Sequence, residues 1–209
     1  MRPTLTASDV RFILASASPA RLSLLQSAGV DVEVIVSGVD EDDVAGTPAE
    51  VALVLAQRKA TAVVDRLATQ ATTVVLACDS VLELDGRAHG KPADASIAIE
   101  RWKSMRGRRG VLHTGHSLAR IGDGGRQDRH ELASAEVRFG NPTDDEIAAY
   151  VATGEPLRVA GGFTLDRLGG WFVEGIDGDP GTVLGLSLPL LRSMLSDVGI
   201  GVHTLWGHR

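Results

Sequence analysis

An arginine near the start of a predicted helix is the first residue that indicates chemistry. The segment "FILASASPARLSLLQSAG" predicts a strand followed by a helix, with Ser18 as the N-cap residue and Pro19 as the first helical residue. Arg21 then lies in the first turn, where unpaired amides and the helix dipole disfavour a cation. Either this side chain bends away into solvent, or an anion shares the helix start, because bare amides and a guanidinium together form a cradle for phosphate or carboxylate.

A carboxylate follows the most hydrophobic segment of the chain. Asp79 ends the apolar run "VVLAC", and ligands of α/β proteins bind beyond the carboxyl ends of strands, so Asp79 is a candidate base or metal ligand. The alternative is that Asp79 only caps the next turn. An acidic loop can add an oxygen ligand for magnesium, although such a run is also typical of solvated surface. It consists of Asp40, Glu41, Asp42 and Asp43.

Two lysines complete a set of complementary charges. Lys59 stands at four-residue spacing from Leu55 and Val63, on or beside the apolar face of a predicted helix, where a lysine can also extend its ammonium group to solvent. Lys91 belongs to the short motif "GKP". Cations together with carboxylates are what a site for a metal and a phosphate requires. The sequence therefore predicts one site from the acidic loop and Arg21, Lys59, Asp79 and Lys91.

Other reactive side chains give weaker signals. Cys78 lies inside the apolar run, where a buried thiol is expected rather than a nucleophile. His113 and His116 would lie on opposite faces of a strand, which argues against a shared metal. Neither G-x-G-x-x-G nor G-x-x-x-x-G-K-[ST] occurs, so a phosphate site here differs from those of the standard nucleotide folds. A cluster of cations at a helix end is expected to be solvated: Lys103, Arg106, Arg108 and Arg109.

Composition is that of a globular protein. Of the 209 residues, 44% are hydrophobic and 23% are charged, and no apolar run reaches the roughly 20 residues of a membrane span. The N-terminal segment "MRPTLTASDV" lacks the apolar part of a signal peptide and the chain has one cysteine, so we expect a cytoplasmic protein. A net charge of -6 argues against nonspecific binding of nucleic acid.

Strand and helix signals alternate along the chain, which predicts one folding unit with a mixed sheet and helices on its faces. Capping boxes, in which a threonine precedes a glutamate by three residues, open two of the helices at Thr47 and Thr143. The predicted helices are 19–28, about 20 residues from 48, 94–107, 143–154 and 187–199. Strands are predicted at 11–15, 30–37, 74–79, 110–121, 133–140 and 168–176, with a glycine-rich loop at 122–128 and a turn at 85–86.

Five motifs occur in the order and spacing of the Maf family of nucleoside triphosphate pyrophosphatases, which the chain resembles over nearly its whole length. They are "ILASASPARLSLL", "CDSVLELDG", "GKPAD", "YVATGEPLRVAGGF" and "GLSLPLL". The resemblance implies an α/β fold related to the inosine triphosphatases, with a mixed central sheet flanked by helices and two lobes around a cleft. It also implies a single domain at 11–209 after an N-terminal extension at 1–10, and a homodimer.

The resemblance further implies hydrolysis of nucleoside triphosphates to monophosphate and pyrophosphate with a divalent cation, Mg²⁺ or Mn²⁺. Asp79 matches the family's proton acceptor, and Glu41 matches a glutamate that would hold the metal with Asp79. Whether Asp79 acts as base, metal ligand or both stays open. The substrate-binding positions implied by the motifs are Ser16, Ser18 and Arg21 in a phosphate-binding turn, and Lys59 and Lys91.

Three positions are expected to set the base preference: Ala20, Ser80 and Asp166. Relatives that prefer thymidine and uridine triphosphates pair an arginine at the position of Ala20 with a glutamine at that of Asp166. An ionised carboxylate only accepts hydrogen bonds, which suits the adjacent donors of guanine and repels the carbonyl oxygens of thymine. Asp166 therefore predicts a guanine-type or modified purine nucleotide, unless it faces solvent or pairs with Arg167.

Two classes of function fit these features. One is a house-cleaning pyrophosphatase that removes noncanonical nucleotides, and the other is a nucleotide-binding regulator of cell division in which hydrolysis is incidental. A base beside a metal has no purpose in a protein that only binds, so the set of charged residues favours the enzyme.

Overall fold

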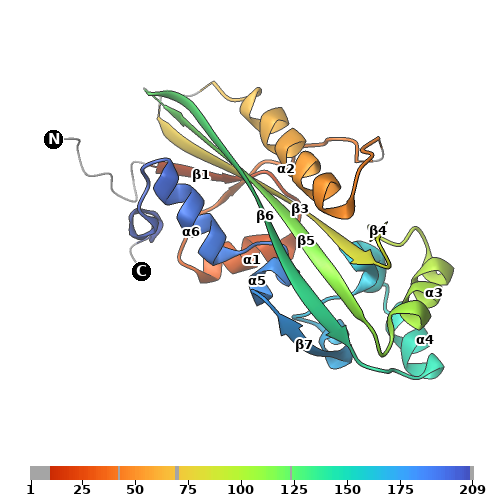
Figure 1. The fold of residues 1–209 in the computed structure, drawn as a ribbon. Coiled ribbons are helices and arrows are strands. Elements are labelled where there is room, and N and C mark those ends of the chain that lie inside the picture. The colour runs from red at the N-terminus through yellow and green to blue at the C-terminus, as the bar shows by residue number, and fades with distance from the viewer. Residues whose placement is uncertain (1–9, 42, 69–70, 123, 208–209) are drawn as a thin grey trace.

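The computed structural model of the chain describes residues 10–41, 43–68, 71–122 and 124–207. These residues form a seven-stranded sheet in the order β2-β1-β3-β5-β6-β7, with β4 paired to β3 (Figure 1). β1 pairs in parallel with β2 and β3, and all other pairings are antiparallel. The predicted mixed sheet is thus confirmed. Its strands are β1 Val10–Leu14, β2 Glu33–Val34, β3 Thr72–Leu84, β4 Arg87–His89, β5 Arg109–Gly122, β6 Gly125–Phe139 and β7 Val173–Asp177.

The helices begin where the sequence places their caps. Thr47 and Thr143 each form the predicted capping box with the glutamate three residues later. Asp94 and Ser187 cap two further helices with their side chains. The α-helices are α1 Pro19–Ser27, α2 Pro48–Val64, α3 Ala95–Met105, α4 Asp144–Ala152, α5 Pro180–Leu184 and α6 Leu188–Asp197, and 3-10 helices lie at Pro156–Arg158, Ala160–Gly162, Leu168–Phe172 and Val202–Leu205.

Hydrophobic packing divides the molecule into two lobes along the sheet. α2 packs on one face of β3 and β5, against Val75, Ala77 and Ala119, whereas α1 and α6 cover the opposite face at the same end (Figure 1). At the other end, α3 and α4 pack around Trp102 against Leu82 and neighbouring strand residues. β3 runs through both lobes, so its middle lies between them.

The middle of β3 has a free edge. Pairing with β1 ends at Leu76, where β1 itself stops at Leu14, and pairing with β4 begins only at Leu82. Along the other edge β3 is paired with β5 from Thr73 to Glu83. The prediction that Asp79 ends a strand or caps a turn is therefore wrong, because the strand that ends here is β1. Asp79 lies at the centre of a 13-residue strand, beside the gap that β1 leaves.

Three other predictions of strands need correction. Only Glu33–Val34 of the predicted strand 30–37 is a strand. β1 offers no partner beyond Leu14, and Val30 pairs with Trp206 in an isolated bridge instead of with β1. β6 begins at Gly125 rather than at 133, since a tight hairpin pairs Gly122 with Gly125 and its polar residues lie on the exposed part of the sheet. The strand predicted at 168–176 begins later: residues 168–172 form a 3-10 helix, and residues 173–177 form β7, which pairs with β6.

The predicted N-terminal extension lies outside the described residues except for Val10, which is already the first residue of β1. The helix predicted to run about 20 residues from 48 has 17. Within the described part of the chain, none of the helices is both long enough and apolar enough to cross a membrane.

Candidate active site

The predicted charge cluster forms beside the free edge of β3. Lys59 comes from α2, Asp79 from β3 and Glu41 from the segment that precedes α2. Lys59 Nζ lies 2.5 Å from Asp79 Oδ1 and 2.6 Å from Glu41 Oε1, so one ammonium group bridges two carboxylates. Asp79 and Lys59 are both only 8% exposed. The alternative that Lys59 extends its ammonium group to solvent is therefore wrong.

The two carboxylates respond differently to the shared ammonium. Burial raises the pKa of the Asp79 carboxyl, and the positive charges of Lys59 and Arg21 offset only part of that rise. Burial also raises the pKa of Glu41, but the hydrogen bond and charge of Lys59, with the more distant charge of Lys91, outweigh it and lower the pKa overall. The difference follows from exposure, since the Glu41 side chain is 44% exposed. The same ammonium thus lies between a carboxyl whose pKa is raised, that of Asp79, and one whose pKa is lowered, that of Glu41.

A glycine in β5 lets α2 approach closely enough for Lys59 to reach Asp79. Gly115 is paired with Asp79 across the sheet. A Cβ atom at Gly115 would come within 2.7 Å of Leu53 Cα and still closer to the carbonyl oxygen of Ala52, both in α2. Because real Cβ atoms do not approach backbone atoms so closely, any larger residue at this position would push α2 away from the sheet.

Arg21 is held from three directions. Its Nη1 donates to Ser16 Oγ at 3.1 Å, its Nη2 to Ser80 Oγ at 3.0 Å and its Nε to the carbonyl oxygen of Gly185 at 2.8 Å. Arg21 is 8% exposed, so the alternative that it bends into solvent is wrong. Three acceptor oxygens satisfy the guanidinium at a helix start that disfavours a cation, and two of its five N–H groups remain for an anion.

The serines before α1 act on Arg21 in different ways. Ser18 is the predicted N-cap residue, and its side chain accepts a hydrogen bond from Arg21 N at 3.4 Å. Ser16 Oγ accepts from Ser18 N at 3.2 Å as well as from the guanidinium. Because both of these bonds use Ser16 as an acceptor, its hydroxyl proton remains available to donate. The turn therefore gathers donors at the end of β1, as a phosphate site requires.

The remaining predicted positions lie at the rim of the site or outside it. Lys91 is exposed, and its charge contributes to the lowered pKa of Glu41. Ala20 is half-buried in the first turn of α1. Asp166 is exposed, and no ion pair within 4 Å joins it to Arg167 among the described residues. Asp42 lies outside the described residues.

A family model described as "Maf-like protein" matches residues 11–198. The chain belongs to the Maf family. A protein of Streptomyces coelicolor named nucleoside triphosphate pyrophosphatase is 58% identical over 199 residues, which cover 94% of each chain. One with the same name from Streptomyces avermitilis is 56% identical over 200 residues, covering 95% of this chain and 96% of the relative. Another from Mycobacterium sp. strain JLS is 50% identical over 206 residues, covering 94% and 98%.

Two further Maf motifs also serve the site. Gly185 of "GLSLPLL" has a φ of +96°, and a Cβ atom there would lie 2.9 Å from Arg21 Nε. A side chain at this position would be strained and would displace the arginine. Glu155 of "YVATGEPLRVAGGF" accepts hydrogen bonds from Tyr150, Thr164 and Gly169, and so ties down the loop that contains Asp166. Sequence reasoning assigned no role to either residue.

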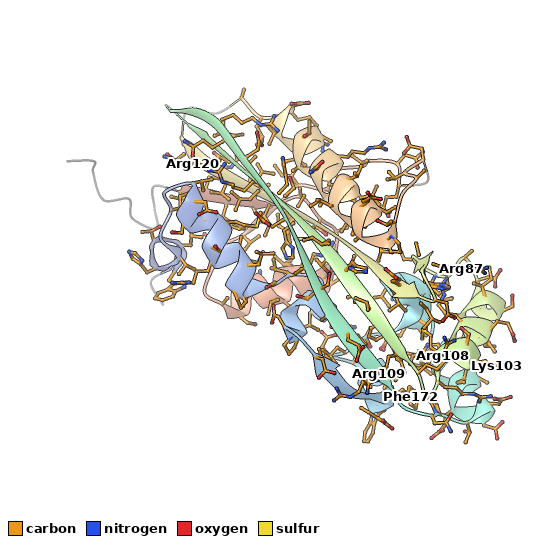
Figure 2. The ribbon with its side chains drawn as sticks, in the orientation of Figure 1. Arg87, Lys103, Arg108, Arg109, Arg120 and Phe172 are labelled. Carbon is orange, nitrogen blue, oxygen red and sulfur yellow. The ribbon has the colours of Figure 1, made fainter. Side chains whose placement is uncertain are left out.

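The weaker sequence signals have structural explanations. Burial raises the pKa of the Cys78 thiol to about 12, so it is not a nucleophile at neutral pH. His113 contacts Ser134 and Glu83, whereas His116 accepts a hydrogen bond from Ser187 N on the opposite face. The clustered cations are neutralised by carboxylates at the end of the sheet near α3 and α4, where Figure 2 labels three of them. The pairs are Lys103–Glu100, Arg106–Asp144, Arg108–Asp85 and Arg109–Glu136.

Two cavities lined by described residues lie away from this site. One of about 400 Å³ adjoins Trp171 and Glu174, and one of about 220 Å³ adjoins Phe12 and Leu205. Neither is lined by any of the charged side chains described above. The Maf site gathers charges beside the free edge of β3, which suits a polyanion that brings its own charge.

The carboxylates fit a metal that is completed by the substrate. Among the described residues, no group of three or more histidine, cysteine, aspartate and glutamate side chains could hold a metal ion. Glu41 and Asp79 nevertheless converge on one cation, the ammonium of Lys59. Mg²⁺ commonly binds through one or two carboxylates together with water and substrate phosphates. The pair therefore fits a metal–phosphate site but not an all-protein metal cage.

Proposed function

We infer that this chain hydrolyses nucleoside triphosphates to nucleoside monophosphate and pyrophosphate. Membership of the Maf family and the names of relatives at 50–58% identity support this inference. The observation that carries it is the bridge from Asp79 through Lys59 to Glu41, beside a guanidinium fixed by three hydrogen bonds. Such a site combines a base, cations for developing negative charge and two carboxylates for a metal.

Arg21, Ser16 and the two lysines are proposed to bind the substrate phosphates. Arg21 has two N–H groups left for phosphate oxygens, and Ser16 has a hydroxyl proton. Lys59 and Lys91 add positive charge, the first buried beside Asp79 and the second exposed at the rim. These groups stabilise the negative charge that develops on the phosphates during displacement.

Asp79 is the residue proposed to orient or deprotonate the attacking water. Its burial raises its pKa, which makes it a stronger base than an exposed aspartate. A divalent cation bound by Asp79 and Glu41 would polarise the α-phosphate and offset its charge. Lys59, whose ammonium bridges both carboxylates, would place a positive charge beside phosphates bound at this site.

The bond that breaks can be tested with oxygen-18 water. Attack at the α-phosphate places the label in the nucleoside monophosphate and leaves pyrophosphate unlabelled. Label in orthophosphate would instead identify a γ-phosphatase and overturn the proposal. The cation requirement is tested separately: excess chelator should stop turnover and Mg²⁺ or Mn²⁺ should restore it, whereas undiminished turnover in chelator would remove the metal from the mechanism.

A panel of nucleotides separates the enzyme from a nucleotide-binding regulator of cell division. The enzyme should turn over a noncanonical or modified purine triphosphate with the highest kcat/KM, and a regulator should bind nucleotides without appreciable turnover.

A cytoplasmic location is proposed because the single cysteine is a buried thiol and nucleotides are intracellular. A homodimer remains a prediction that follows from the family, and sedimentation velocity would test it.

A further inference from the structure

A chain of hydrogen-bonded hydroxyl groups runs from Arg21 into the sheet. Arg21 Nη2 donates to Ser80 Oγ at 3.0 Å, and Ser80 Oγ lies 2.9 Å from Thr114 Oγ1. Thr114 Oγ1 in turn donates to the carbonyl oxygen of Thr182 at 2.8 Å. The chain of hydrogen bonds therefore passes from α1 through β3 and β5 to α5.

The number of protons fixes the direction of every bond in this chain. A hydroxyl has one proton to donate, and a carbonyl oxygen can only accept. Thr114 gives its proton to the carbonyl oxygen of Thr182, so the proton between Ser80 and Thr114 belongs to Ser80. Ser80 then has no proton left and meets the guanidinium only as an acceptor. This polarity matches Arg21, which has donors but no acceptor.

The carbonyl oxygens of α5 and of the residue that ends it thus hold Arg21 in place. Nε of Arg21 donates directly to the carbonyl oxygen of Gly185, which ends α5, while Nη2 is connected through two hydroxyls to Thr182. A guanidinium is planar, so fixing two of its nitrogens against one short helix fixes the plane of the group. The orientation of its two remaining N–H groups follows from that plane.

We propose that Thr114 is a positioning residue for Arg21. It is fully buried, with 0% exposure, so it acts on the reaction only through Ser80 and the guanidinium. Without the Thr114 hydroxyl, the Ser80 proton loses its acceptor and Ser80 turns to find another, which weakens its hold on Arg21. This inference rests on the proposed function, in which Arg21 binds the substrate phosphates.

Thr114→Val is the first test, because valine keeps the shape and removes the hydroxyl. The kcat/KM for a nucleoside triphosphate should fall by about tenfold or more, mainly through kcat, since small misplacements of a catalytic cation are costly. Thr114→Ser should recover most of the lost activity. Wild-type kcat/KM in Thr114→Val would overturn the proposal.

Thr204→Val is the matched control. Thr204 is also a buried threonine, 9% exposed, whose Oγ1 donates to a carbonyl oxygen, that of Gly201, at 2.8 Å. It belongs to the 3-10 helix at Val202–Leu205, at the end of the chain and outside the site. The two valine variants should lose similar thermal stability, but only Thr114→Val should lose activity. Equal losses of activity would mean that Thr114 has only a structural role.

Coupling to Arg21 separates this proposal from general damage. In an Arg21→Gln background, Thr114→Val should change kcat/KM less than twofold, because the group that it positions is gone. A full tenfold effect in that background would overturn the proposal.

A nuclear magnetic resonance measurement tests the same point without turnover. The Nη protons of Arg21 should exchange slowly in the wild type and in Thr204→Val, and faster in Thr114→Val. Unchanged exchange in Thr114→Val would overturn the positioning role. If the wild-type protein hydrolysed no triphosphate, the proposed function would fail, and the exchange measurement would still decide whether Thr114 orients Arg21.

Discussion

Asp79 and Ser80 are consecutive residues that organise opposite faces of β3. On the face toward α2, Asp79 belongs to a cluster of charges in which one lysine bridges two carboxylates. On the other face, Ser80 belongs to a chain of hydrogen-bonded neutral hydroxyls and carbonyls that ends on α5 and holds Arg21. Alternation of side chains along one strand thus separates two kinds of polar environment by a single residue.

The difference between the two faces lies in how each can respond to a ligand. Coulomb attraction depends weakly on direction, so the charge cluster can exchange partners when a substrate and cation bring new charges. Hydrogen bonds depend strongly on angle, and on the other face the hydroxyls of Ser80 and Thr114 have their protons committed. The α2 face is therefore suited to rearrange during the reaction, and the Arg21 face is suited to remain in place.

The largest effect is expected from Asp79→Asn, which keeps the shape of the side chain and removes its charge. Loss of the base and of an anionic ligand should reduce kcat by about 10²-fold or more while nucleotide binding survives. The control is Asp85→Asn, whose exposed carboxylate pairs with Arg108 at the far end of the strand and should leave kcat unchanged. If purified Asp79→Asn kept more than about a tenth of the wild-type rate, the assignment would be wrong, because the loss would be smaller than the usual effect of removing a general base, about 10²-fold or more.

The position of Arg21 in the first turn of α1 shows how much of the site could be predicted from the sequence. A cation at a helix start conflicts with the local rules, and such conflicts tend to mark functional residues. The charged members of the cluster are indicated by their own chemistry, and the structure brings Glu41 and Asp79 each within hydrogen-bond distance of Lys59. Charged residues can be predicted as site residues because a buried charge needs a compensating partner.

The neutral members of the site could not be predicted in the same way. Thr114 lies in "LHTGHSLARI", where a threonine is an ordinary strand residue and its hydroxyl has no signal of its own. Gly115 and Gly185 matter because of backbone atoms from distant segments, α2 in one case and Arg21 in the other. Such contacts depend on tertiary packing, and no spacing within the chain encodes them.

Secondary structure followed the same division. Helix starts were predictable because their caps are local, as at Thr47 and Thr143. Strand ends depended on partners: β2 ends at Val34 because β1 stops at Leu14, and β3 continues past Asp79 because β5 accompanies it. Asp79 was therefore predicted beside the end of its own strand, whereas the strand that ends beside it is β1.

Gly115→Ala should damage the α2 face without touching a charged group. The added methyl group meets the backbone of Ala52 and Leu53, so α2 must move and Lys59 must move with it. We expect a loss of stability at the upper end of the ~1–3 kcal/mol typical of overpacked cores, together with lower kcat/KM. Denaturant unfolding and turnover would measure both.

The control for Gly115→Ala is Gly124→Ala. Gly124 has open space around the position of a Cβ atom, and the expected change in stability is within about 0.5 kcal/mol. Wild-type stability and activity in Gly115→Ala would mean that the approach of α2 is not what sets the position of Lys59.

His116 offers a pH-dependent test of the Arg21 face. It is fully buried and accepts a hydrogen bond from Ser187 N at 2.9 Å, next to the segment that holds Arg21. Burial lowers its pKa to about 4, while the hydrogen bond to the Thr114 carbonyl and the charge of Asp179 oppose that shift. The unfolded chain therefore binds more protons between the unfolded pKa, about 6.5, and 4, and folding loses stability as the pH falls through that window.

Between pH 7.5 and pH 5, this single group should account for about 2 kcal/mol of lost stability. His116→Gln removes the titration, so its stability should fall less steeply with pH than that of the wild type. Thr204→Val serves as a control for general destabilisation and should keep the wild-type slope, because it removes no titratable group. Parallel slopes for His116→Gln and the wild type in urea unfolding would refute the role of this histidine.

The smallest effect is expected at the rim, where Asp166→Gln should alter which base is accepted. Asp166 is exposed on a loop that Glu155 ties to Thr164 and Gly169, so its backbone is fixed while its side chain is open to a ligand. A carboxylate there favours the adjacent N–H donors of guanine, whereas a glutamine amide can donate to a thymine carbonyl oxygen and accept from its N–H. The ratio of kcat/KM for guanosine over thymidine triphosphate should therefore fall by about tenfold, since one good base contact is worth on the order of 1–3 kcal/mol. Arg167→Gln, which changes the adjacent side chain, is the control and should leave the ratio unchanged. An unaltered ratio in Asp166→Gln would show that this carboxylate faces solvent in the complex and that base preference arises elsewhere, whereas a lower ratio with unchanged stability would assign the loop to recognition of the base.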